Sequence, residues 1–156
     1  MKPKFDFEEV KQVVEDCLRR KGLRKTSERF HILKHIYERG GHFDADTLYV
    51  ELRNKGINVS RATVYNTLDL FTKCGILTSL FFTPHHIVYD FSYKAKQHEH
   101  LYCEVCGKIE EFCDPRLSII EEDVQKLTGF KIIKRNVVFR GICSECQKKM
   151  QEKSEK

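Results

Sequence analysis

Two cysteine pairs constrain this chain more than any other feature of its sequence. They are Cys103-x-x-Cys106, which Gly107 follows, and Cys143-x-x-Cys146. Each pair forms a knuckle that directs two thiolates at one point, and two knuckles supply the four thiolates of a closed tetrahedral zinc site. A closed site leaves no coordination position open for catalysis, so we expect structural Zn2+. The alternative is one or two redox dithiols.

The remaining cysteines are interpreted through the expected cellular compartment. No stretch approaches the run of about 18 apolar residues that a membrane helix needs, and no apolar signal-peptide segment follows the N-terminus. We therefore expect a cytoplasmic protein without a membrane partner, in which structural disulfides are not favoured. Seven cysteines leave at least one thiol outside any pairing. Cys17 and Cys74 are expected to be small buried hydrophobes, whereas the role of Cys113 stays open.

Apolar periodicity predicts four helices and a β-hairpin in the first part of the chain. Stripes and capping residues place the helices at 7–21, 26–39, 44–54 and 61–73, and the strands at 76–82 and 86–91. These are the elements of a winged helix-turn-helix domain, which we assign to residues 1–91.

The second part of the chain reads as a small α/β domain over residues 98–148. Strands are expected at 99–102, 108–112 and 130–142, and a helix at 115–128. Residues 92–97 are polar and without hydrophobic period, so they are expected to be a hinge. Residues 149–156 are charged and expected to form a flexible tail. The predicted fold class is α+β.

Two polar clusters suggest binding sites. Seven basic residues against Glu28 alone lie between Arg19 and Lys34, which favours a polyanion as much as a solvated helical face. His98 and His100 point to one face of a strand, where both can bind one metal ion, and Glu111 on the next strand can fold back towards them. Alone, these three residues could equally be surface polar groups. The other histidines expected at the surface are His31, His35, His85 and His86.

At this point the residues resemble the ferric uptake regulator superfamily of metal-dependent transcriptional regulators. The stretch His98–Phe112 looks like its HxHxxCxxCGxxxEF signature, and Val59–Leu68 looks like its recognition helix. Gly22–Arg29 resembles the segment that starts its second helix. The resemblance runs from about Glu8 to Cys146, nearly the whole chain.

The resemblance implies a repressor rather than an enzyme, acting as a homodimer on double-stranded DNA with a palindromic AT-rich operator. Residues 98–148 then form the dimerisation domain. It also implies a regulatory metal site that joins the two domains. Its ligands are His42, Asp90, His98, His100 and Glu111. Nitrogen and oxygen donors suit Fe2+, the first expectation, but also Mn2+ or Zn2+.

Some positions depart from the family pattern or divide its branches. An auxiliary metal site of part of the family has Gln97, Ser118 and Arg135 at its ligand positions here, so we expect it to be absent. Glu111 resembles iron regulators, whereas Asn66 resembles peroxide sensors. The main expectation is iron-dependent control of iron-uptake genes, and the alternatives are a peroxide-sensing or zinc-uptake regulator of the same superfamily. A zinc-binding enzyme or redox protein is the alternative of another class.

The helix at 61–73 also predicts how DNA would be read. At about 100° per residue, its core face consists of apolar residues: Val64, Leu68 and Phe71. The opposite face offers Tyr65 for a thymine methyl and Asn66 for an adenine, with Arg61 at the flank for a phosphate or a guanine. Arg24 and Arg29 look like backbone or minor-groove contacts, as the resemblance implies.

Overall fold

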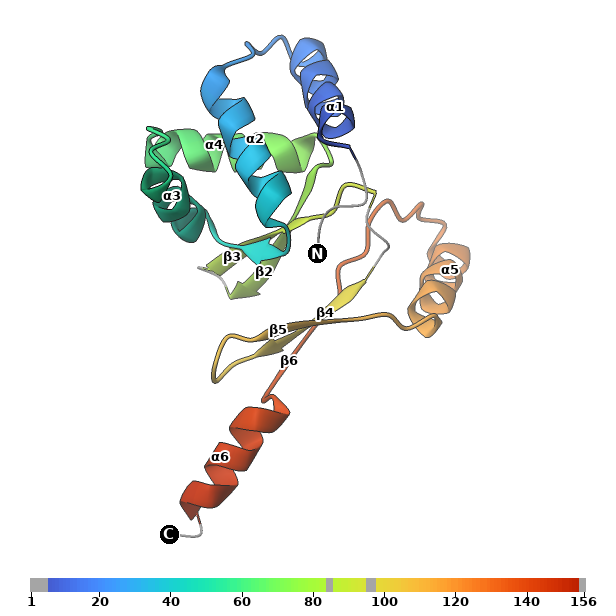
Figure 1. Ribbon diagram of the computed structural model, residues 1–156. Coiled ribbons are helices and arrows are strands. Elements are labelled where there is room, and N and C mark those ends of the chain that lie inside the picture. Colours follow the sequence, from blue (N-terminus) through green and yellow to red (C-terminus); the bar gives the residue numbers. More distant parts are fainter. Residues whose placement is uncertain (1–5, 84–85, 95–97, 155–156) are drawn as a thin grey trace. The chain divides into compact units, whose positions relative to one another are not determined.

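The computed structural model describes residues 6–83, 86–94 and 98–154, and it has the predicted α+β composition (Figure 1). The chain divides into two compact units, Met1–Ala95 and Lys96–Lys156. The predicted turn after Thr83 and the end of the predicted hinge, residues 95–97, lie outside the described ranges. Among the described residues, no helix has the length and apolar character needed to cross a membrane.

The N-terminal unit contains four helices and a small antiparallel sheet, as the sequence predicts. Its helices are α1 (Phe7–Arg20), α2 (Ser27–Arg39), α3 (Ala45–Asn54) and α4 (Arg61–Lys73). The sheet has the order β1-β3-β2, formed by β1 (His42–Phe43), β2 (Leu77–Thr83) and β3 (His86–Phe91). The sequence did not predict β1, because two residues are too few to show a period.

Side-chain caps and apolar stripes explain where these helices begin and how they pack. Asp44 accepts a hydrogen bond from the Thr47 amide at 2.7 Å, and Ser60 accepts one from the Thr63 amide at 3.0 Å, so α3 and α4 begin at capped ends. One stripe of each helix enters a shared core, whose fully buried members include Val10, Val14, Leu18, Ile32, Leu33, Ile36, Leu48, Leu52, Val64, Leu68 and Phe71.

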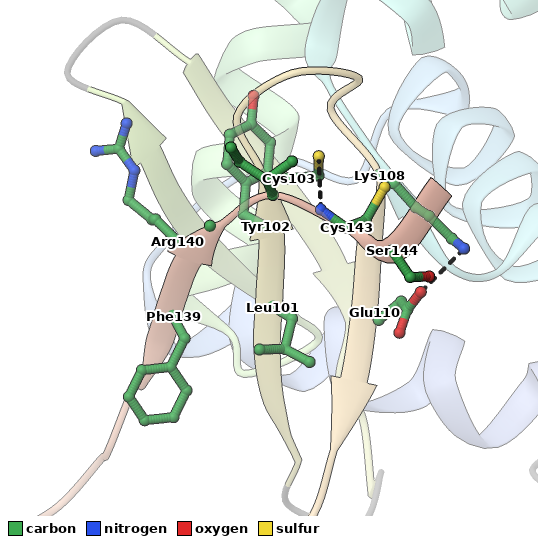
Figure 2. Close-up of a pocket in the computed structure, with 11 residues that line it drawn as sticks. Leu101, Tyr102, Cys103, Lys108, Glu110, Phe139, Arg140, Cys143 and Ser144 are labelled. Carbon is green, nitrogen blue, oxygen red and sulfur yellow. Dashed lines mark hydrogen bonds and ion pairs between the residues drawn. The ribbon is translucent and has the colours of Figure 1, made fainter. Parts of the chain in front are cut away.

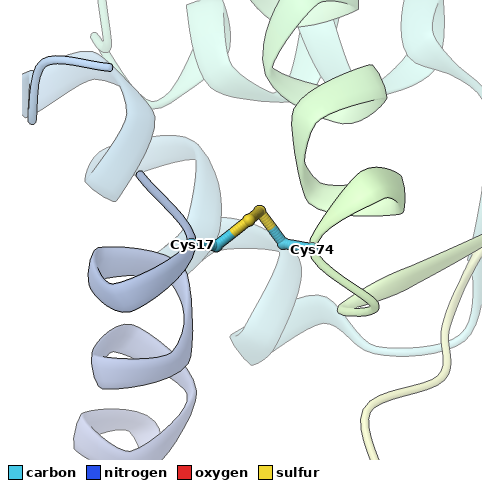
Figure 3. Close-up of a disulfide and its surroundings, with 2 residues drawn as sticks. All are labelled: Cys17 and Cys74. Atoms are coloured by element: carbon cyan, nitrogen blue, oxygen red, sulfur yellow. A yellow bond between two sulfur atoms is a disulfide. The ribbon is translucent and has the colours of Figure 1, made fainter. Parts of the chain in front are cut away.

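Cys17 and Cys74 form a disulfide between α1 and the end of α4 (Figure 3). The expectation of two unpaired buried thiols was therefore wrong. Their Cα atoms lie 5.8 Å apart although 57 positions separate them along the chain, and no local spacing could indicate that contact. The pairing also accounts for the odd cysteine count, since Cys113 is the remaining thiol outside both the disulfide and the two knuckles.

His35 is another residue that sequence reasoning misplaced. Its side chain is buried, with Nε2 2.8 Å from a carboxylate oxygen of Glu51. Arg39 Nε donates to both oxygens of the same carboxylate at 3.1 Å. A polar residue enters the interior here because a neighbouring helix supplies its partner, which the sequence pattern of α2 alone does not reveal. His31 is exposed as expected, and His85 and the side chain of His86 lie outside the described residues.

The C-terminal unit is a mixed three-stranded sheet with two helices. The strands are β4 (Glu99–Cys103), β5 (Ile109–Phe112) and β6 (Val138–Gly141), and β4 lies in the middle, antiparallel to β5 and parallel to β6. The helices are α5 (Arg116–Thr128) and α6 (Ser144–Ser154). The predicted flexible tail is thus helical as far as Ser154.

The strand predicted at 130–142 is confined to β6. Two amides before β6 donate to side chains instead of to a neighbouring strand: Ile132 N–H to Gln125 Oε1 at 2.9 Å, and Val137 N–H to Glu99 Oε2 at 3.1 Å. Apolar residues can follow strand periodicity without a backbone partner, so their pattern overestimated the length of β6.

Candidate metal sites and nucleic-acid surface

The four paired cysteines converge in the C-terminal unit. Their sulfur atoms all lie within 4.8 Å of one another, and those of Cys106 and Cys143 are 3.7 Å apart. Local structure produces this: Gly107, with φ +72°, permits the turn after the first knuckle. The parallel pairing of β4 with β6 sets Cys103 opposite Gly141, two residues before the second knuckle.

The electrostatics of this cluster suit a divalent cation. The backbone N–H of Cys143 donates to Cys103 Sγ at 3.3 Å (Figure 2), and with the Cys106 amide it lowers the Cys103 pKa to about 6. Burial and the neighbouring sulfur atoms instead raise the pKa of Cys146 to about 12. The first thiolate forms readily, but a full set requires a compensating positive charge, which tetrahedral zinc supplies.

A cavity of about 330 Å³ opens beside the cysteine cluster (Figure 2). Its walls are partly apolar, with Leu101 from β4 and Phe139 from β6. Charged residues also line it, among them Lys108, whose amine lies 2.9 Å from Glu110 and 3.3 Å from Glu145. The hydrogen bonds and charges of these two carboxylates raise the Lys108 pKa well above its ordinary value, so the amine stays protonated and is no general base.

The five expected regulatory ligands form two sets, one in each unit. In the N-terminal unit, His42 on β1 pairs in register with Asp90 on β3, and His42 Nε2 lies 3.9 Å from Asp90 Oδ1. In the C-terminal unit, the His98 and His100 rings lie 4.9 Å apart, centroid to centroid. Glu111 on β5 is the register partner of His100, and its Oε1 lies 3.7 Å from His98 Nε2.

The expected DNA-contacting residues lie at the surface of the N-terminal unit. On α4, Tyr65 and Asn66 are exposed on the side opposite the core, and Arg61 is exposed at its first turn. Arg24 is exposed between α1 and α2, and half-buried Arg29 donates a hydrogen bond to the Arg24 carbonyl. This surface therefore combines an aromatic ring, an amide and several guanidinium groups.

Comparison with known proteins decides the family. The profile of the Ferric uptake regulator family matches residues 20–140. This chain belongs to that family. Regulators of the family bind DNA operators as dimers, so the chain is a metal-responsive transcription repressor and not an enzyme. The predictions of family and fold class are confirmed.

Individual relatives of this ferric uptake regulator family member extend the comparison. The "Peroxide operon regulator" of Bacillus subtilis (strain 168) is 36% identical over 141 residues, covering 90% of this chain and 95% of the relative. The "Peroxide-responsive repressor PerR" of Staphylococcus aureus (strain Mu50 / ATCC 700699) is 34% identical over 147 residues, covering 92% and 98%. Among solved structures, the Helicobacter pylori ferric uptake regulator superposes with a TM-score of 0.79 at 26% identity, covering 94% of this chain and 97% of that one.

Arg135, one of the three residues expected at the positions of the family's auxiliary metal site, belongs to an ion-pair network. Arg135 donates to Glu99 on β4 at 2.8 Å and to Glu121 on α5 at 2.9 Å. Ser118 is exposed on α5, and Gln97 lies outside the described residues. A guanidinium thus compensates the two carboxylates in this part of the family fold.

Sequence reasoning missed one residue of the nucleic-acid surface, Asp46 in the first turn of α3. Its carboxylate forms an ion pair with Arg61 of α4. A single acidic residue at a helix N-terminus gives no signal of a partner 15 positions away.

Proposed function

We propose that this protein is a metal-dependent repressor that releases DNA in response to peroxide. The observation that carries the proposal is its 36% identity, over 90% of its length, to a relative named as a peroxide operon regulator. Asn66, exposed on α4, agrees with it, since peroxide sensors resemble this chain at that position. Peroxide sensing thereby replaces iron-uptake control as the leading interpretation.

In this proposal the two ligand sets act as one regulatory site. His42 and Asp90 from the N-terminal unit, together with His98, His100 and Glu111 from the C-terminal unit, hold Fe2+. The mixed imidazole and carboxylate donors suit Fe2+ or Mn2+, and Zn2+ as a competitor. Metal binding then couples the DNA-binding unit to the dimerisation unit, because each unit supplies only part of the coordination shell.

Bound Fe2+ supplies the one-electron reduction of hydrogen peroxide. With the ion bound, His42 and His98 would present oxidisable imidazole carbons to this chemistry. The net change, a ring C–H and H2O2 giving an oxygenated imidazole and water, would remove a good nitrogen donor, so the link between the units would be lost and the repressor would leave its operator.

The cysteine cluster has a separate structural role in the proposal. Cys103, Cys106, Cys143 and Cys146 bind Zn2+ as four thiolates and fasten β4, β6 and the start of α6 together. This assignment is supported by the convergence of their sulfur atoms within 4.8 Å.

A second copy of the chain is the proposed partner of the C-terminal unit. None of the residues of α5 is buried, and the exposed fraction reaches 85% for Leu127, 76% for Phe130 and 94% for Ile133. Apolar side chains this exposed mark an interface, and family members act as dimers. Two copies would present Arg24, Arg29, Arg61, Tyr65 and Asn66 to successive half-sites of a palindromic AT-rich operator.

The test compares anaerobically purified protein loaded with Fe2+ or with Mn2+. A duplex enriched from random DNA by the Mn2+ form serves as the operator probe. Both forms should bind it, and removal of the regulatory metal should abolish binding. Brief exposure to hydrogen peroxide should release only the Fe2+ form, with a mass gain of one oxygen atom on the peptides that contain His42 or His98.

Iron-uptake control remains the second candidate because of Glu111. Its carboxylate lies 3.7 Å from His98 Nε2, and iron regulators resemble this chain at that position. Under this candidate the Fe2+ form would keep both its operator affinity and its unmodified histidines after peroxide. Binding supported by Zn2+ alone would instead indicate a zinc-uptake regulator.

A further inference from the structure

Asp46 holds two of the proposed DNA-contacting residues at once. Its carboxylate accepts a hydrogen bond from Arg61 Nη1 and lies near enough to the Tyr65 hydroxyl group to raise the pKa of that phenol. The Arg61 guanidinium also lies over the Tyr49 ring, 4.6 Å from its centroid. Two residues of α3, Asp46 and Tyr49, therefore fix the position of two residues of α4.

These contacts have an effect on Tyr65 that is independent of DNA. Burial raises the pKa of the Tyr65 phenol, and the charge and hydrogen bond of Asp46 raise it further. The hydroxyl group therefore stays protonated beside the Asp46 carboxylate, while 46% of the residue remains exposed. The exposed part of the ring is free to pack against a base while its hydroxyl end faces this carboxylate.

The local helix structure does not require Asp46. The N-terminus of α3 is already capped by Asp44, which accepts hydrogen bonds from the Thr47 amide and the Thr47 hydroxyl, both at 2.7 Å. Asp46 follows in the first turn, where an acidic residue gains only a few tenths of a kcal/mol to about 1 kcal/mol from the helix dipole. An anion on a surface meant for DNA also weakens attraction to the phosphates.

We propose that Asp46 is a specificity-determining residue of this repressor. It holds Arg61 and Tyr65 in a fixed relation to each other, so that they meet base edges in the major groove without first losing side-chain freedom. It also neutralises Arg61, so that this guanidinium contributes less to sequence-independent binding. The inference rests on the proposed reading of DNA by α4 and identifies the residue that makes this reading selective.

The experiment measures discrimination between two duplexes by the Mn2+-loaded full-length protein. One duplex is enriched from random DNA by the wild type, and the other has the same composition in scrambled order. Asp46→Ala should bind the scrambled duplex more tightly. The slope of its log affinity against log salt concentration should be steeper by about the value for one phosphate contact. The ratio of the two affinities should fall by about tenfold or more, the loss expected for one base contact.

Two further variants separate positioning from charge and from folding. Asp69→Asn removes a charge from α4 that pairs with Lys73 and not with Arg61, so it should raise both affinities and preserve their ratio. Asp46→Asn keeps the side-chain volume and an oxygen acceptor for Tyr65, so it should lower the ratio less than Asp46→Ala even if the alanine variant is less stable.

A double-mutant cycle gives the deciding result. In a protein that carries Arg61→Gln and Tyr65→Phe, Asp46→Ala should have no further effect on the ratio. A continued fall in that background, an unchanged ratio in the wild-type background, or an equal fall in Asp69→Asn would overturn the inference. Failure of the wild type to enrich any sequence would instead refute the proposed function itself.

Discussion

Glu51 connects the core of the N-terminal unit to the backbone of a proposed metal ligand. Its carboxylate binds buried His35 and Arg39, and Arg39 NH1 also donates to the His42 carbonyl oxygen at 2.9 Å. The Arg39 guanidinium further lies 5.4 Å from the centre of the Phe43 ring. The two residues of β1 are thus held by a side-chain network, which compensates for the shortness of the strand.

The charge on Glu51 should stabilise this unit above a defined pH. Burial alone raises the pKa of the Glu51 carboxyl, but the hydrogen bonds from His35 and Arg39 hold it below its ordinary value of 4.5. The contribution of this charge to the free energy of unfolding is complete above pH 4.5, the ordinary pKa of the group. It is lost as the pH falls through the lower pKa of Glu51 in the folded state. Glu51→Gln should therefore lower the free energy of unfolding by about 1–2 kcal/mol near neutral pH, and by much less in acid, as measured by urea denaturation.

Glu38→Gln is the matched control for this prediction. Glu38 also pairs with basic residues, but at 4.0 Å from Lys34 and 3.9 Å from Lys55, on an exposed surface. Such pairs contribute little, so this variant should behave like the wild type at both pH values. Equal losses in the two variants would show that the buried network is not the source of the pH dependence.

At the residue scale, the sequence predicted which side chains could bind metal better than it predicted hydrogen-bond and ion-pair partners. Cys-x-x-Cys spacing and the alternation of His98 and His100 have fixed geometric consequences, and the structure shows both. The partners of His35 and Arg61 lie on other helices, at distances along the chain that no period describes. Such contacts depend on tertiary packing and so could not be predicted.

At the element scale, the disulfide joins the first helix of the N-terminal unit to the end of its last one. Closing a loop across 57 positions restricts the unfolded chain, and the chain-entropy estimate of this effect is about 4 kcal/mol. Reduction, or the double variant Cys17→Ala with Cys74→Ala, should therefore lower the melting temperature of the N-terminal unit substantially. Circular dichroism of the helices measures this, and Cys113→Ser should leave it unchanged.

A direct thiol count tests the same linkage. Metal-free protein, denatured without reductant, should alkylate at the five cysteines outside the disulfide, which are Cys103, Cys106, Cys113, Cys143 and Cys146. After reduction all seven should react. Seven reactive thiols before reduction would contradict the disulfide.

Helices α1 to α5 were the most predictable elements, because each has an apolar stripe and a signal at one or both ends. The longer elements that were not predicted correctly are α6, whose sequence is polar and charged, and the strand at 130–142. Its residues alternate well enough for a strand, yet Gln125 and Glu99 occupy two of its amides. Whether a side chain or a neighbouring strand accepts from these amides depends on tertiary packing. Hydrophobic periodicity carries no signal of it.

At the scale of the whole molecule, the two units differ in what stabilises them. The N-terminal unit has an extensive apolar core, whereas the buried apolar residues described in the C-terminal unit are the cysteines Cys103 and Cys146. A unit with so little interior depends on bound metal and on its partner. The spacing of the knuckles predicted the metal in this unit and the family resemblance implied the partner, but neither indicated how much apolar surface α5 leaves exposed.

Removal of zinc should therefore affect the units unequally. A strong chelator, or Cys143→Ser, should convert the dimer into monomer on size-exclusion chromatography and abolish operator binding. The helical signal of α1 to α4 should persist, because the N-terminal core contains no cysteine of the cluster. Mild acid should have a similar effect, since zinc binds deprotonated thiolates and protons compete with the metal for them. A zinc-free protein that stays dimeric would show that the cluster is not what maintains the interface.

The parallel pairing of β4 with β6 brings the two knuckles together at the base of a long excursion of the chain. Within it, the chain leaves the sheet at the end of β5, forms α5 and returns to the sheet at β6. With its ends fixed, lengthening such a loop costs little additional entropy. The length and sequence of this segment can therefore vary, and the protein surface that α5 presents to a partner can vary with them. The two cysteine knuckles that fix its ends stay the same.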